Sequence, residues 1–318
     1  MPELPDVTVY LEALAARVGG ARLERIRLAN PFVLRSVDPG PAEAVGRPVI
    51  GVRRLGKRIV IALEGEIFVL IHLMIAGRLH WKEVGAKLPG KIGLAAFDFS
   101  TGTVTLTEAG SKRRAAIHLV RGEAALAAHD PGGLELWDAD PAAFRAAITR
   151  ESHTLKRTLT DPRILSGIGN AYSDEILHRA RLSPVRMTRQ LSEEESTRLF
   201  EAAKATLTDW IERLRREAGG TFPEGVTAFR PDMAVHGRYG RPCPDCGAPV
   251  QRIVHADNET NYCARCQNAG RLLADRALSR LLHQDWPRTL EELEERRPAG
   301  AAEVTTRAAD PPRARRRR

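Results

Sequence analysis

The chain has 318 residues, enough for about two domains with buried cores, and its hydrophobic fraction of 43% is ordinary for a globular protein. No apolar run approaches the roughly 20 residues of a membrane span, and no basic-then-apolar leader opens the chain, so we expect a cytoplasmic protein without a membrane partner. The net charge of +9 favours a polyanionic partner, although five of these charges lie in the arginine-rich end at residues 313–318.

The chain begins Met1-Pro2-Glu3-Leu4-Pro5-Asp6. Loss of Met1 would leave Pro2 with a secondary α-amine, and the pKa of such a group, about 7.7–8.0, keeps a nucleophilic fraction at neutral pH. Attack on an aldehyde-level carbon gives an iminium ion, and Glu3 is close enough in sequence to move the protons required. The alternative is structural, because Pro2 and Asp6 also suit the start of a helix, which we expect over residues 7–18.

Short β-branched runs follow as far as about residue 120, separated by glycine and acidic turns. They fall at residues 49–52, 58–63, 67–71 and 104–107. This spacing predicts a β-sandwich or barrel-like domain, which we place at residues 1–130. Gly56-Lys57-Arg58 forms a basic tip between two strands, where Lys57 either reaches a phosphate or proton-transfer site or is simply solvated. A second basic loop reads Ser111-Lys112-Arg113-Arg114.

After Pro131-Gly132-Gly133 the periodicity is helical, which predicts a second domain at residues 131–235. The expected helices span residues 141–150, 152–159, 171–180 and 192–217, the last opened by a Ser192/Glu195 capping box. In the glycine-containing turn before residue 171, the Gly169 and Asn170 amides are available to bind a phosphate, with Lys156 adding a charge. The alternative is an ordinary turn between two helices.

The four cysteines form two Cys-x-x-Cys pairs, separated by sixteen residues. Cys243 and Cys246 make up the first pair, and Cys263 and Cys266 the second. Four thiolates close a tetrahedron and leave no open position, so we predict one structural Zn²⁺ in a β-hairpin zinc finger at residues 236–270. A redox function is the competing interpretation, but it requires one such pair. Residues 271–318 form an extension, expected to be disordered beyond about residue 298.

In this order, the motifs resemble the formamidopyrimidine-DNA glycosylase/endonuclease VIII family of base-excision repair enzymes, as far as about residue 270. Leu4 between two prolines is more similar to the formamidopyrimidine branch. The resemblance rests on Pro2-Glu3-Leu4-Pro5, Gly56-Lys57, His72-Leu73 followed by Gly77, Gly169-Asn170-x-Tyr172-x-x-Glu175, and the cysteine module ending Tyr262-Cys263-Ala264-Arg265-Cys266-Gln267.

The resemblance implies an α+β multidomain protein: an N-terminal helix with a β-sandwich, a helix-two-turn-helix domain and a zinc finger. It also implies a bifunctional DNA glycosylase/AP lyase that removes a damaged base, expected to be an oxidised purine. Pro2 would attack C1′ of a flipped-out deoxynucleotide, Glu3 would protonate the sugar, and Lys57 would donate a proton during β-elimination. We expect a monomer of bacterial, nucleoid-associated type, bound to double-stranded DNA that contains a damaged base or abasic site.

The resemblance also implies DNA contacts, and here the chain departs from the family. The implied contact residues are Lys156, Gly169, Asn170, Tyr172, Lys91, Ile75, Arg113, Arg114 and Asn258. Asn258 replaces an arginine assigned to δ-elimination, so we expect cleavage to stop mainly at β-elimination. Ile75 stands at the position of a methionine, and Ala115 or Ala116 at that of a phenylalanine, both of which fill the gap left by the flipped base. The usual Asp-Pro before the arginines is absent.

These departures keep two alternatives open. One is a protein that binds damaged or abasic DNA with little or no turnover. The other is a zinc-ribbon nucleic-acid protein of a different kind, for which the N-terminus would be irrelevant.

Overall fold

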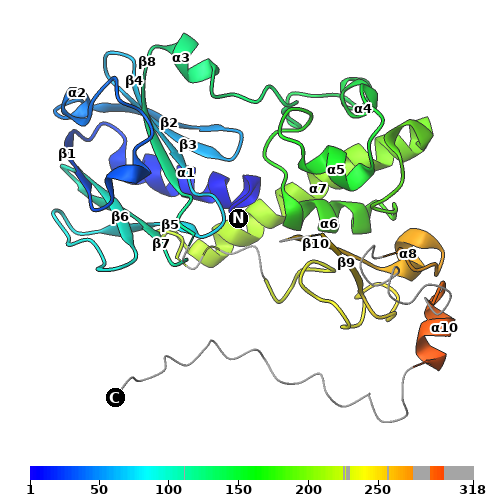
Figure 1. The fold of residues 1–318 in the computed structure, drawn as a ribbon. Coiled ribbons are helices and arrows are strands. Elements are labelled where there is room, and N and C mark those ends of the chain that lie inside the picture. The colour runs from blue at the N-terminus through cyan, green and yellow to red at the C-terminus, as the bar shows by residue number, and fades with distance from the viewer. Residues whose placement is uncertain (111, 225, 227–229, 256–257, 275–286, 297–318) are drawn as a thin grey trace, which may run out of the picture.

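The structure is a computed structural model that describes residues 1–110, 112–224, 226, 230–255, 258–274 and 287–296 (Figure 1). The disorder predicted beyond about residue 298, and much of the predicted extension at residues 271–318, lie outside these residues. Among the described helices, none is long and apolar enough to cross a membrane. The chain forms a sandwich, a helical layer and a hairpin module, which confirms the predicted α+β architecture.

The sandwich consists of two four-stranded antiparallel sheets. One has the order β1 (Leu23–Leu28), β6 (Gly93–Phe99), β7 (Gly102–Glu108) and β5 (Gly77–Lys82), and the other β2 (Val49–Leu55), β3 (Arg58–Leu63), β4 (Ile67–His72) and β8 (Ala116–Arg121). The four predicted runs lie in β2, β3, β4 and β7. The strands β1, β5, β6 and β8 were not predicted, because charged residues, glycine and alanine lower their strand propensity and pairing with neighbours outweighs it.

Helix α1 (Leu4–Val18) packs its apolar face, with Val7, Tyr10 and Leu14, into the core between the two sheets. The short segments η1 (Pro31–Val33), α2 (Pro41–Ala44) and α3 (Glu123–Ala127) lie around the sandwich. The helix predicted at residues 7–18 is present, but its predicted first residue was wrong by three positions. Asp6 Oδ2 accepts a 2.9 Å hydrogen bond from the Glu3 amide, so the helix begins at Leu4.

The second domain contains α4 (Pro141–Thr149), α5 (Leu155–Thr160), α6 (Asn170–Arg179), η2 (Thr188–Gln190) and the long α7 (Glu193–Ala218). The predicted capping box is confirmed: the Glu195 amide donates to Ser192 Oγ at 3.1 Å, and the Ser192 amide donates to Glu195 Oε2 at 2.9 Å. Leu4 belongs to the core of this domain, and its amide donates to the Gly167 carbonyl at 3.0 Å. The N-terminus therefore lies at the junction of the two domains, as Figure 1 shows.

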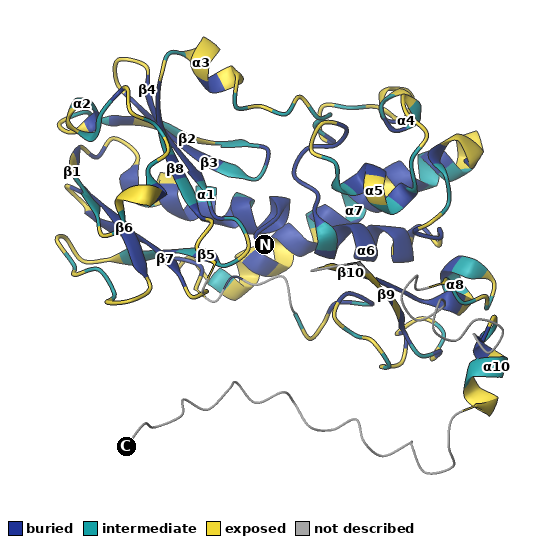
Figure 2. Cartoon of the chain, in the orientation of Figure 1, coloured by how far each residue is buried: buried dark blue, intermediate teal, exposed yellow. Residues whose placement is uncertain are grey.

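The C-terminal module contains β9 (Gln251–His255), β10 (Asn258–Tyr262), α8 (Ala264–Asn268) and α10 (Leu290–Glu295). A buried carboxylate joins it to the helical domain. Glu175 of α6 accepts hydrogen bonds of 2.7–2.9 Å from the amides of Ala234, Val235 and His236. Figure 2 shows that α6 is buried along most of its length, between α7 and this module.

Asp6 predicts a pH dependence of stability. Burial raises its pKa to about 7, and Oδ1 has no hydrogen-bond partner among the described residues. The folded state then binds this proton more tightly than the unfolded state, so Asp6 lowers the free energy of unfolding as pH rises from about 4 to about 7. Asp6→Asn should remove this component, worth on the order of 1.4 kcal/mol per pKa unit.

Urea unfolding of wild type, Asp6→Asn and the exposed control Glu12→Gln at pH 5 and pH 8 measures this effect. The free energy of unfolding of Asp6→Asn, relative to that of wild type, should be higher at pH 8 than at pH 5. An equal difference from wild type at both pH values would contradict the assignment.

Candidate active site and metal centre

The first three residues are packed against the start of helix α6. Pro2 and Glu3 are buried, and the α-amine of Met1 is largely buried among Glu3, Asp6, Lys57 and Arg78. Burial, opposed by Glu3, lowers the pKa of this amine below its usual value. An N-terminal amine at this place is therefore more often neutral, and more nucleophilic, than an exposed one.

The carboxylate of Glu3 caps helix α6. It accepts hydrogen bonds from the amides of Gly169 at 2.6 Å, Ala171 at 2.9 Å and Tyr172 at 3.3 Å. A helix N-terminus favours an anion, and here that anion is the protein's own side chain. The Gly169 amide, predicted to hold a phosphate, is bound to Glu3 in this structure.

Lys57 approaches the same point from the sandwich. It lies in the turn between β2 and β3, where Gly56 adopts a φ of 60°. A Cβ placed on Gly169 would lie 2.6 Å from Glu3 Oε1 and 2.8 Å from Lys57 Nζ, so only glycine fits between the two groups. Burial lowers the pKa of Lys57, Glu3 opposes this shift, and Lys156 adds to it. Of the predicted trio, Glu3 and Lys57 are thus brought together at Gly169, and Pro2 is buried next to Glu3 in the chain.

Lys156 and Asn170 are held inside the protein. Lys156 Nζ donates to the Asn170 carbonyl at 2.7 Å, to Ser173 Oγ at 2.8 Å and to Asp174 Oδ1 at 2.6 Å. The Asn170 side chain donates to the Glu259 carbonyl at 2.9 Å, across to β10. Lys156 Nζ has three N–H donors and makes three hydrogen bonds, so a phosphate contact would require it to exchange one of them, whereas Asn170 Nδ2 donates one of its two hydrogens to Glu259.

Tyr172 is buried in the helical core, with its ring 5.8 Å from that of Trp210. The predicted DNA contact of its side chain does not fit this position. The side chain supports α6 from within, and its backbone amide binds Glu3.

The other predicted contact residues of the sandwich lie near one another on the surface. Ile75 is exposed in the turn between β4 and β5, and Arg113 donates to the carbonyl of Lys91. The amides of Arg114 and Ala115 bind the buried carboxylate of Glu108. Ala115 is itself buried, so it offers no side chain to a ligand.

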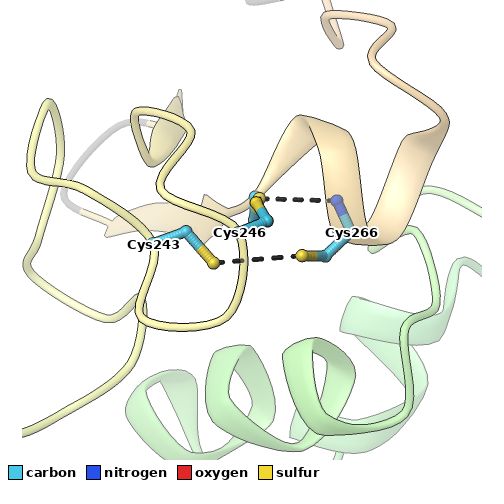
Figure 3. Close-up of side chains that lie close together, drawn as sticks. Cys243, Cys246 and Cys266 are labelled. Carbon is cyan, nitrogen blue, oxygen red and sulfur yellow. Dashed lines mark hydrogen bonds between the residues drawn. The ribbon is translucent and has the colours of Figure 1, made fainter.

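The four cysteines converge, as predicted, and their sulfur atoms all lie within 4.8 Å of one another. The Sγ–Sγ distances are 3.9 Å for Cys243–Cys266 and 3.4 Å for Cys246–Cys263 (Figure 3 shows three of the four residues). Zn–S bonds of about 2.3 Å in a tetrahedron place sulfurs about 3.8 Å apart, so this donor set fits a closed, structural zinc site.

Three functional neighbours were not predicted as site residues. His178 of α6 places Nε2 3.2 Å from Cys243 Sγ, and Asp174 binds Lys156, His236 and the Asn261 amide. His72 lies beside Lys57 and Arg58, and its pKa is lowered to about 4, first by burial. In the sequence, His72 stands out only through the motif His72-Leu73 followed by Gly77. No sequence pattern links His178 to a cysteine 65 residues away.

Asn258 is exposed at the start of β10. Two arginines of the module could in principle replace the charge that Asn258 lacks, but both have other partners. Arg252 lies 4.4 Å from the centre of the Tyr239 ring and 3.6 Å from Glu259 Oε2, and Arg265 donates to the Cys246 carbonyl at 3.3 Å.

Three family models match the chain. They are the formamidopyrimidine-DNA glycosylase N-terminal domain over residues 1–121, the formamidopyrimidine-DNA glycosylase H2TH domain over residues 133–220, and the zinc finger found in FPG and IleRS over residues 240–269. The last match agrees with the sulfur geometry, and the four cysteines are therefore a structural zinc site.

Curated relatives and solved structures agree with these matches. A formamidopyrimidine-DNA glycosylase of Thermus thermophilus is 33% identical over 85% of this chain and 100% of its own length; that of Heliobacterium modesticaldum is 32% identical over 84% and 100%. The crystal structure of MutM (Fpg) from Thermus thermophilus has a TM-score of 0.70 at 32% identity, over 84% of this chain and 98% of that one. A Lactococcus lactis Fpg complex shares the fold, with a TM-score of 0.74 at 24% identity over 84% and 100%.

The N-terminal site, the cysteine module and these matches lead to one conclusion. The chain belongs to the formamidopyrimidine-DNA glycosylase family, whose members are base-excision repair glycosylases with AP lyase activity.

Proposed function

We propose that this chain removes a damaged base, an oxidised purine, from double-stranded DNA through an N-terminal proline and then cuts the strand at the abasic site. The observation that carries the proposal is the meeting of the N-terminus, Glu3 and Lys57 around Gly169. The name of the curated relatives, formamidopyrimidine-DNA glycosylase, supports a purine-derived lesion. The partner is DNA containing such a base or an abasic site, bound by a monomer.

The chemistry begins once Met1 has been removed. The Pro2 nitrogen attacks C1′ of a deoxynucleotide that has rotated out of the duplex, and the base leaves with the electrons of its bond to C1′. The attack leaves a proton on the Pro2 nitrogen, and the Glu3 carboxylate takes up this proton and passes it to the ring oxygen. The bond between C1′ and the ring oxygen then breaks, and an iminium ion forms between Pro2 and C1′. The iminium acidifies the proton on C2′, and loss of that proton expels the 3′ phosphate by β-elimination. Lys57, whose pKa is lowered by burial, donates a proton in this sequence.

We assign the catalytic sandwich to residues 1–130, the helix-two-turn-helix domain to residues 131–235, the zinc finger to residues 236–270 and the extension to residues 271–318. The matched ranges, 1–121, 133–220 and 240–269, support this division. In this arrangement Ile75, Lys91, Arg113, Arg114 and the start of α6 face the DNA. Phosphate contacts by the basic residues of this set should make binding salt-dependent, and the enzyme should act on the nucleoid in the cytoplasm.

The N-terminal nucleophile is tested by borohydride trapping on an abasic-site duplex. Wild type should form a covalent adduct, because borohydride reduces the iminium to a stable amine. Pro2→Gly should form far less adduct, whereas the control Pro5→Gly, which keeps the terminal residue, should retain it. Failure of wild type to form an adduct with any abasic or oxidised duplex, despite salt-sensitive binding, would show a non-catalytic binder instead.

The product of strand cleavage is tested at Asn258. Asparagine is neutral and short, so wild-type cleavage should stop mainly at the β-elimination end. Asn258→Arg should shift the product towards a one-nucleotide gap with phosphates at both ends, and the control Asn268→Arg on α8 should not. Gel analysis of end-labelled duplex separates these products. A clean one-nucleotide gap produced by wild type would refute the role given to Asn258.

Removal of zinc should unfold the module while leaving the sandwich folded, because the module's core is small and the metal supplies much of its folding free energy. A colorimetric chelator should report about one zinc per chain. The loss should weaken binding to an abasic duplex, as measured by fluorescence anisotropy. Cys246→Ser should reproduce the effect, and the neighbouring Asp245→Asn should not. Retention of full duplex affinity by the metal-free protein would contradict this prediction.

A further inference from the structure

One end of the sheet β2-β3-β4-β8 carries the residues that face the proposed duplex. Arg58 at the start of β3 pairs with His72 at the end of β4, and His72 pairs with Ala116 at the start of β8. The turn holding Lys57, the turn at residues 73–76 and the loop at residues 109–115 therefore meet at this end. We call these three connections, as far as they are described, the rim.

A fourth segment reaches the rim along the outer edge of β8. Leu34 forms a parallel bridge with Ile117, and the Arg35 amide donates to the Ile117 carbonyl at 2.8 Å. Because this segment runs parallel to β8, the residues before Leu34 lie towards the start of β8, which is the rim. The turn η1 therefore stands next to the loop that contains Arg113 and Arg114. The amide of Ala29 also donates to the Leu94 carbonyl at 2.9 Å, which ties η1 to the start of β6.

Phe32 projects from this turn and is 77% exposed, the largest exposed fraction among the described aromatic residues. Its backbone is nevertheless fixed. The Phe32 amide donates to Asn30 Oδ1 at 3.0 Å, Pro31 begins the turn, and Val33 is buried in the sandwich core. Because this large apolar ring is held in solvent, a ligand that covers it lowers the free energy of the complex.

The surroundings of Phe32 have the character of a surface that binds distorted DNA. Ile75 and Ile92, at 58% and 42% exposed, add apolar surface near the rim, and exposed basic side chains from residues 112–114 lie beside it. Proteins that open a duplex combine cations for the phosphates with apolar side chains inserted between bases. Ala115 offers no apolar side chain for insertion between bases, because it is 3% exposed and its amide binds Glu108.

We propose that Phe32 enters the gap that the rotated nucleotide leaves in the duplex, where its ring stacks on the neighbouring base beside Ile75. This inference rests on the proposed function. It assigns the stacking side chain to the η1 turn, a segment distant in sequence from the loop at residues 109–115. Base stacking on an aromatic ring is tolerant of sequence, so Phe32 contributes affinity for the gap and not for a particular base.

The experiment compares wild type, Phe32→Ala, Phe32→Trp and Val37→Ala. Val37 is the matched control, because it lies in the same segment, is 94% exposed and falls further along the chain, beyond the bridge to β8. Dissociation constants are measured by anisotropy for an undamaged duplex and for one containing a tetrahydrofuran abasic analogue. A 2-aminopurine beside the analogue reports stacking by loss of its fluorescence.

Phe32→Ala should bind the abasic duplex about five-fold or more weakly, the lower end of what a lost aromatic–base stack costs. It should also lose part of the 2-aminopurine quenching and bind the undamaged duplex as wild type does. Phe32→Trp should retain both affinity and quenching, and Val37→Ala should match wild type.

The inference is overturned if Phe32→Ala weakens abasic binding no more than Val37→Ala does, or weakens both duplexes equally. Borohydride trapping by wild type separates this failure from that of the proposed function. If wild type forms the adduct and Phe32→Ala binds normally, only the role of Phe32 is wrong. If wild type shows neither adduct nor preference for the abasic duplex, both are wrong.

Discussion

The structure depends on the contact between the Glu3 carboxylate and the N-terminus of helix α6. Three amides at the start of α6 converge on one side chain from the start of the sandwich domain, so a buried anion lies where the two domains meet. The same contact orients the N-terminal segment and brings Lys57 next to Gly169. A helix end that would otherwise attract an external phosphate thus helps to build the proposed active site.

A second network makes the helical domain and the zinc module one unit. Asp174 accepts from Lys156, His236 and the Asn261 amide, while Glu175 accepts from three consecutive amides where the chain enters the module. Both carboxylates are buried on α6, and a buried anion is stable only when donors surround it. His178 of the same helix touches a zinc ligand. Helix α6 therefore links the proposed nucleophile to the metal centre.

Some of this was predictable from the sequence, for physical reasons that differ between residues. Continuous β-branched runs identified β3 and β4, and the Ser192/Glu195 capping box located the start of α7, because these signals are local. The zinc site was predictable because its ligands come in two short pairs that constrain each other. In contrast, β5 and β6 contain glycine and alanine, and they are strands because β5 pairs with β7 and β6 pairs with both β1 and β7.

In the candidate site, too, the sequence predicts the chemistry of some residues but not the contacts that depend on the fold. The chemistry of Pro2 and Glu3 is visible in their residue types, but Glu3 and its hydrogen-bond donor at Gly169 are 166 residues apart, so only the fold brings them together. Lys156 and Tyr172 were expected to meet DNA because of their motif. In the structure Lys156 is paired with Asp174 and Tyr172 lies in an apolar core, and both placements depend on tertiary packing that no spacing reveals.

The burial of the first residues has a consequence for biosynthesis. The ribosome makes this segment first, yet its partners at residues 167–172 emerge only after roughly 165 further residues, about ten to thirty seconds later at ordinary elongation rates. During that interval the initiator methionine is accessible to a processing aminopeptidase. Once the helical layer has docked, Met1 is partly buried, and Pro2 and Glu3 are buried. We therefore expect the proposed removal of Met1 to take place during synthesis, before residues 167–172 have emerged and folded.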